Sequence, residues 1–147
     1  MNAPHNPPFS MTLTVRDTCM CLHVQRAARA LARRFDEALK PHGLTNQQFS
    51  LLMSLNRPQP PRMKEVALLL ALDRTTLTAN LKPLERRGLL TIEPDGDDRR
   101  SRRLALTDDG RALLVAALPA WCETEANVEA GLKGDAETIR AELRMMA

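Results

Sequence analysis

The stretch that decides the fold lies between Arg62 and Gly110. Residues 62–88 read RMKEVALLLALDRTTLTANLKPLERRG, and residues 89–110 read LLTIEPDGDDRRSRRLALTDDG. The first part predicts a short apolar helix over 63–72 and a second helix over 73–88. Strand-like runs at 89–93 and 103–107 enclose the loop 94–102. This order of elements predicts a winged helix-turn-helix.

The second helix carries Arg and short hydrogen-bonding side chains, which suit the major groove of DNA because base edges there present distinct donors and acceptors. An ordinary solvated helix face, capped by Asp73, is the alternative, but such a face would use Glu and Lys freely. The helix is therefore predicted to bind double-stranded DNA. Its expected contacts are Arg74, Thr75, Thr76, Thr78 and Asn80 for bases or backbone, and Lys82 and Arg86 for phosphates.

The loop between the two strands is rich in arginine. Arg99, Arg100 and Arg102 are expected to reach the DNA backbone or the minor groove, where negative potential is strongest. The alternative is a flexible charged loop in which these arginines are equivalent.

The remaining sequence is mostly helical. Residues 17–40 show a heptad-like apolar stripe, and Thr45 is a candidate N-cap for a helix to Leu55. Pro119 should kink or interrupt a helix that follows Thr107. We expect a flexible arm over 1–14 and a single domain over 15–147. Within it, 45–110 would form the winged helix-turn-helix, and 15–44 and 111–147 the dimerisation helices. The fold class is mainly α with a small β-hairpin wing.

Composition excludes several classes of protein. Aromatic residues are 3% of the 147, with no Tyr, which argues against binding single strands by stacking. No run reaches the about 18–20 apolar residues of a membrane span, and three cysteines favour a reducing, bacterial-type cytoplasm. The sequence offers no metal site, cofactor motif or catalytic set, so an enzyme is not expected. A winged helix that binds protein instead of DNA is the alternative from another class.

Three passages resemble the MarR family of transcriptional regulators: residues 41–49, residues 73–89, and residues 98–110 through the wing. The resemblance implies a homodimer with interlocking terminal helices, bound to a pseudo-palindromic operator and associated with the nucleoid when bound. It implies a repressor released by a small phenolic or aromatic acid, or by an oxidant. It also implies that Asp73 pairs with the wing residue Arg100, and that the second helix continues through Pro83.

The resemblance also predicts an effector pocket. Its apolar candidates are Phe49, Leu52, Met53 and Trp121, and Arg16, His23 and Arg26 could meet a carboxylate, although each is compatible with simple packing. Cys21 lies where hydroperoxide sensors of this family keep a reactive cysteine, with Cys122 as a possible resolving partner. However, the supporting tyrosines are replaced by Phe35 and Asn46. Cys21 also belongs to the apolar stripe, so a buried structural thiol is the first expectation.

Overall fold

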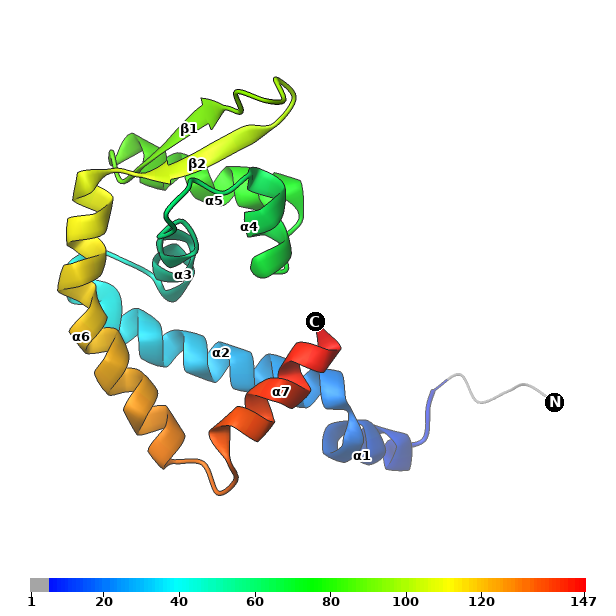
Figure 1. Cartoon of the computed structure of the whole chain (residues 1–147). Coiled ribbons are helices and arrows are strands. Elements are labelled where there is room, and N and C mark those ends of the chain that lie inside the picture. The colour runs from blue at the N-terminus through cyan, green and yellow to red at the C-terminus, as the bar shows by residue number, and fades with distance from the viewer. Residues whose placement is uncertain (1–5) are drawn as a thin grey trace. The chain divides into compact units, whose positions relative to one another are not determined.

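The computed structural model describes residues 6–147, and it is mainly helical with a two-stranded antiparallel hairpin, as predicted (Figure 1). The elements are α1 (Phe9–Thr18), α2 (Met20–Leu39), the short 3-10 helix η1 (Lys40–His42), α3 (Asn46–Ser54), α4 (Met63–Leu69), α5 (Arg74–Arg86), β1 (Leu90–Pro94), β2 (Arg102–Leu106), α6 (Asp108–Ala130) and α7 (Ala136–Met146). The chain forms two compact units, one ending at Arg34 and one comprising Phe35–Ala147.

Side-chain caps fix where the helices of the second unit begin. Thr45 and Gln48 form a capping box at α3, in which each side chain bonds the other residue's backbone N–H. Asp73, Thr107 and Asp135 cap α5, α6 and α7 by accepting a backbone N–H three residues later. The Asp73 cap sets the start of α5 at Arg74.

A leucine-rich core holds the winged part together. Leu77, Leu81 and Leu84 form the buried face of α5, and they belong to a cluster that includes residues of α3, α4, both strands and α6. In Figure 1 the hairpin lies along the group α3–α5, and α6 starts where β2 ends. Burying each such leucine stabilises the fold by about 1.5–3 kcal/mol, so α5 has a firm base from which to project its other face.

The proline-rich loop before α4 pairs with the free edge of β2, the edge opposite β1. Leu90 pairs with Leu106 and Ile92 with Leu104 in the antiparallel register. Leu104 N donates to Pro61 O at 3.0 Å, and Arg62 forms an isolated bridge with Arg103. The wing is thereby attached at its base to the start of α4.

Gly110 lies at a tight joint between α6 and the segment that leaves α5. A Cβ atom at this position would lie 2.1 Å from Leu89 O, which no real Cβ tolerates. Thr107 closes the same joint, because its N–H donates to Leu89 O and its hydroxyl donates to Gly88 O at 2.6 Å. Only glycine lets the two backbones approach this closely.

One expectation about local structure is wrong. Residues 9–14 belong to α1, so an arm over 1–14 does not describe them, and residues 1–5 lie outside the described residues. Pro119 does not interrupt α6, which continues through it, and a kink at this position stays a prediction. A proline removes the bond to the carbonyl four residues earlier, which is that of exposed Val115. That part of the helix faces solvent, where water can take the place of the lost donor.

Within residues 6–147, no helix is both long enough and apolar enough to cross a membrane.

Candidate nucleic-acid interface

One face of α5 is free of the core and carries the predicted DNA contacts. Arg74, Thr75, Lys82 and Arg86 are exposed, and Thr78 is half-buried beside them. The Thr78 hydroxyl donates to Arg74 O at 2.8 Å. Because its only proton is used within the helix, this hydroxyl offers an outside partner an acceptor. The face therefore combines a forked donor, Arg74, with an oriented acceptor.

Two residues predicted for this face lie elsewhere. Asn80 is half-buried and lines a cavity of about 220 Å³ with residues of α3 and α4, so a contact with DNA stays a prediction for this residue. Thr76 donates its hydroxyl to Asp73 at 2.8 Å and serves the helix start. Because each helical residue turns by 100°, Thr76 lies about 200° around α5 from Arg74, and Asn80 lies about 200° from Thr78. The sequence suggested one polar face, but the helical rotation divides it.

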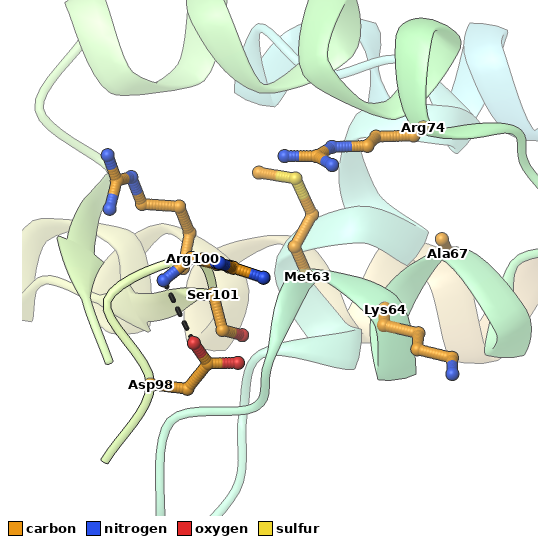
Figure 2. Close-up of a pocket in the computed structure, with 8 residues that line it drawn as sticks. Met63, Lys64, Ala67, Arg74, Asp98, Arg100 and Ser101 are labelled. Carbon is orange, nitrogen blue, oxygen red and sulfur yellow. Dashed lines mark hydrogen bonds between the residues drawn. The ribbon is translucent and has the colours of Figure 1, made fainter. Parts of the chain in front are cut away.

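A basic cavity of about 380 Å³ separates the start of α5 from the wing. Figure 2 shows Arg74 on α5 and Arg100 and Ser101 on the hairpin, with Met63 of α4 between them, and Ala67 of α4 also lines the cavity. Lys64 and Arg102 also line it, against a single acid, Asp98. Four cations around one hollow create the positive potential that a phosphate backbone requires. Lys64 was missed because its helix was interpreted as a short apolar helix and a lone Lys beside Glu65 gives no signal of a binding role.

The predicted pair of Asp73 and Arg100 does not form. Both residues are described, and Asp73 instead accepts the N–H and hydroxyl of Thr76, each at 2.8 Å. These bonds, the backbone one first, lower the pKa of the Asp73 carboxyl. The Arg100 backbone N–H donates to Asp98 Oδ1 at 3.0 Å, and its exposed side chain lines the cavity (Figure 2). Arg99 and Arg102 are exposed as well.

The acid that does organise the wing is Asp95, which the sequence did not single out. Its side chain is only 3% exposed, and it accepts from Arg62 Nε at 2.6 Å and from Arg103 Nε at 3.2 Å. The Asp97 N–H, followed by Arg103 and Arg62, lowers the pKa of the Asp95 carboxyl against the opposing effect of burial. No local signal identifies it, because Asp97 and Asp98 are equally acidic neighbours and Arg62 lies 33 positions earlier.

The aromatic side chains gather at a second cavity, of about 210 Å³, inside the second unit. Phe35, Phe49 and Trp121, three of the four aromatic residues of the chain, line it. Phe49 stacks on Trp121 with ring centroids 6.0 Å apart. Asn46, Ser50 and Glu125 provide the polar lining, and Glu125 accepts from Arg140 at 2.9 Å. The predicted apolar candidates Phe49 and Trp121 thus meet, whereas Leu52 belongs to the core and Met53 is not part of the lining.

The three cationic candidates for the effector pocket occupy the first unit. Arg16 pairs with its neighbour Asp17 at 2.5 Å, and that bond raises the pKa of the guanidinium. His23 and Arg26 line a groove on α2 together with Arg29 and Arg33. The aromatic cavity contains none of these side chains in its lining.

In the single chain Cys21 is exposed, and the Gln25 amide donates to its sulfur at 3.1 Å. Its burial under a second protomer stays a prediction. The stripe itself stays open in this single chain, since Leu31 is 38% exposed. Cys122 is exposed too. Within the described part of the chain, no three His, Cys, Asp or Glu side chains are grouped as metal ligands would be.

Comparison with known proteins places this arrangement in a family. The MarR family matches residues 42–101. The transcriptional regulator MosR of M. tuberculosis, solved in complex with DNA, is 39% identical with a TM-score of 0.80, and the match covers 87% of this chain and 92% of that chain. BpsR of Bordetella bronchiseptica, whose DNA binding is regulated by 6-hydroxynicotinic acid, is 29% identical with a TM-score of 0.75, over 86% and 91% of the two chains.

The HTH-type transcriptional regulator TtmR of Methylorubrum extorquens is 37% identical over 97 residues, which are 66% of this chain and 50% of TtmR. The matched segment spans about half the length of the curated relatives. MosR and TtmR are transcriptional regulators, and none of the three similar proteins is described as an enzyme. This chain belongs to the MarR family.

Proposed function

We propose that this chain is a sequence-specific, double-stranded DNA-binding regulator that acts as a homodimer and represses transcription. The observation that carries the proposal is the exposed α5 face beside an arginine-bearing hairpin, with the basic cavity between them. Each protomer would place α5 in a major groove and the hairpin against the flanking backbone or minor groove. Such a protein works in the cytoplasm, on nucleoid DNA.

The side chains of α5 suggest what is recognised. Arg74 has the fork of donors that matches guanine O6 and N7, and the Thr78 oxygen is left to accept from an amino group of adenine or cytosine. Lys82 and Arg86, further along the same face, suit phosphates. The expected operator is pseudo-palindromic, with half-sites about 34–36 Å apart, one helical turn.

Uncovered apolar side chains on the terminal helices support the homodimer. Phe9 in α1 is 73% exposed, and Ile139 and Leu143 of α7 are 37% and 45% exposed. Soluble monomers rarely expose grouped apolar side chains of this size. A second copy of the chain is the partner that covers them in this proposal.

Selection of bound fragments from genomic DNA, followed by sedimentation of the complex, tests the proposal. We expect enrichment of a few pseudo-palindromic sites, each bound by two protomers. If no sequence is enriched and binding to duplex DNA is absent, the winged helix serves a protein partner and the proposed function is wrong.

For the signal that releases the repressor, we propose a small aromatic or phenolic acid bound in the aromatic cavity. Phe35, Phe49 and Trp121 offer ring faces, and Asn46 and Ser50 offer hydrogen bonds that orient a ring substituent. Glu125 would repel a carboxylate, but its pairing with Arg140 limits that repulsion. BpsR, which responds to 6-hydroxynicotinic acid, supports this class of ligand.

Exposure of Cys21 favours a second candidate signal, an organic hydroperoxide. The thiolate would take the terminal oxygen of the peroxide to give a sulfenic acid, with the alcohol as leaving group. Operator release by wild type and Cys21→Ser should be compared under cumene hydroperoxide and under benzoates and phenolic acids. Release by an acid in both proteins supports the aromatic ligand. Release of wild type alone by hydroperoxide, with no effect of any acid, replaces it with the thiol sensor.

A further inference from the structure

Two groups of arginines lie at the hairpin, and they differ in whether they bind the buried carboxylate of Asp95. Arg62 and Arg103 bind Asp95, at 2.6 and 3.2 Å, and are 43% and 30% exposed. Arg99, Arg100 and Arg102 are exposed and form no ion pair among the described residues. The first two therefore hold the hairpin, and the other three are available to DNA.

We propose that Asp95 is a positioning residue for DNA binding: without touching DNA, it locks the hairpin to the start of α4 and so sets where the three free wing arginines lie. This inference rests on the proposed function. Asp95 is almost completely buried, so it cannot itself contact a groove or a phosphate.

The contacts of Asp95 join three separate pieces of the chain. Its Oδ2 accepts from Arg62, the residue that precedes α4, and its Oδ1 accepts from Arg103 on β2. The same Oδ1 accepts the Asp97 N–H at 3.2 Å, inside the loop. One carboxylate thus fixes the loop both to its own strand and to the neighbouring helix.

Backbone hydrogen bonds hold the rest of the wing loop, residues 95–101, beside Asp95. Asp95 N donates to Ser101 O at 3.1 Å, and Ser101 N donates to Asp98 O at 2.9 Å. The segment between them carries Arg99 and Arg100. At the base, Arg103 Nη1 donates to Pro60 O at 2.7 Å. The direction of the loop is therefore determined at Asp95 and Arg103, and the arginines of the tip follow it.

The sign of the expected effect distinguishes this role from simple electrostatics. Replacing Asp95 with Asn removes a negative charge near the DNA, which alone would strengthen binding to a polyanion. Asn cannot hold two guanidinium groups as a carboxylate does, so the hairpin is released. Positioning therefore predicts weaker binding, the opposite of the charge effect.

The test uses the full-length protein and an operator that wild type binds. For Asp95→Asn we expect weaker binding to all sequences. We also expect a salt dependence flattened by about 0.9 in the logarithmic slope for each wing arginine that leaves its phosphate. Asp97→Asn is the matched control, because it makes the same charge change at an exposed loop position and should keep the wild-type slope. Hydroxyl-radical footprints should lose protection only at the flanks that the wing covers.

A double-mutant comparison decides whether Asp95 acts through the wing. With Arg99, Arg100 and Arg102 replaced by Ala, adding Asp95→Asn should cost no further affinity. An undiminished loss in that background, or an unchanged affinity and slope for Asp95→Asn alone, overturns the proposal. If Asp95→Asn fails to fold, Arg62→Gln, which leaves the Arg103 pair, must show the same slope change. Failure of wild type to bind any DNA would instead refute the proposed function.

Discussion

Between Leu39 and Ala117 sixteen hydrophobic side chains are buried, whereas α1 (Phe9–Thr18) and α7 (Ala136–Met146), described in full, bury none. Yet α7 has a clear apolar side, with Ile139 and Leu143 four positions apart. The winged part is thus complete within one chain, and the terminal helices are not. The two regions differ in role. The winged part presents side chains to DNA, and the terminal helices require a partner to bury their apolar surface.

The largest expected effect follows from breaking the terminal helices. Ile139→Glu with Leu143→Glu places charges where the second protomer is proposed to pack, so the dimer should dissociate. Operator affinity should then fall by about 10²–10⁴-fold, because two half-sites are no longer bound together. Sedimentation and gel-shift titration measure both changes.

Ala141→Glu is the control for that experiment, because residue 141 lies about 200° around α7 from both apolar positions. It should remain a dimer with wild-type affinity. A dimeric double variant would show that another surface joins the protomers and would remove the contrast between the two regions.

The next effect concerns the self-sufficient core. Leu81 is fully buried in α5, so Leu81→Ala should lower the free energy of unfolding by about 2–5 kcal/mol. Denaturant unfolding at two protein concentrations separates this local loss from dimer dissociation, which alone depends on concentration. A loss below 1 kcal/mol would mean that α5 is supported by something other than the leucine core.

A smaller effect should separate DNA recognition from assembly. Arg74→Ala is expected to reduce discrimination between operator and random DNA by about 1–3 kcal/mol, if Arg74 reads a guanine. The dimer should be unaffected, because Arg74 lies on the exposed face of the winged part. Equal affinity ratios for variant and wild type would exclude base reading by this residue.

The smallest expected effect is a pH dependence of the stability that Asp95 contributes to the winged part. The pKa of Asp95 is lowered in the folded chain, so its contribution is complete above the unfolded value of about 3.9. It is lost as pH falls through the lower folded value. The stability difference between wild type and Asp95→Asn should stay constant from pH 5 to 8 and shrink below about pH 4. Urea unfolding at each pH measures it, and a difference that grows toward acid would refute the assignment.

Much of this fold could be predicted because its signals are local. Thr45, Asp73 and Thr107 are caps whose partners lie three residues away, and the apolar period of α5 gives its buried face directly. Helix α1 was missed because Pro7 and Pro8 suggested an irregular arm, although a proline just before a helix is compatible with its start. Whether Pro119 would interrupt α6 could not be decided from the sequence, since the exposure of Val115 is a tertiary property.

The site was less accessible to sequence reasoning because its contacts are long-range. Arg74 and the wing arginines were identified by type and position. The hydrogen bond between Arg62 and Asp95 joins residues 33 positions apart, and no sequence pattern distinguishes Asp95 from the neighbouring acids Asp97 and Asp98. The expected Asp73–Arg100 pair came from family resemblance and is replaced by a cap. Asn80 was grouped with Arg74 by residue type alone, although its position around α5 places it beside a cavity with α3 and α4.

The joint at Gly110 has a mechanical consequence. No side chain lies between the start of α6 and the carbonyl of Leu89, so nothing there can be compressed. Helix α6 carries Trp121 at the aromatic cavity, while Leu89 lies three residues after the end of α5. We therefore expect a tilt of α6 to be passed to the end of α5 through this direct backbone contact. Position 110 should accordingly stay glycine in every functional variant of this protein, whatever operator or ligand that variant has come to recognise.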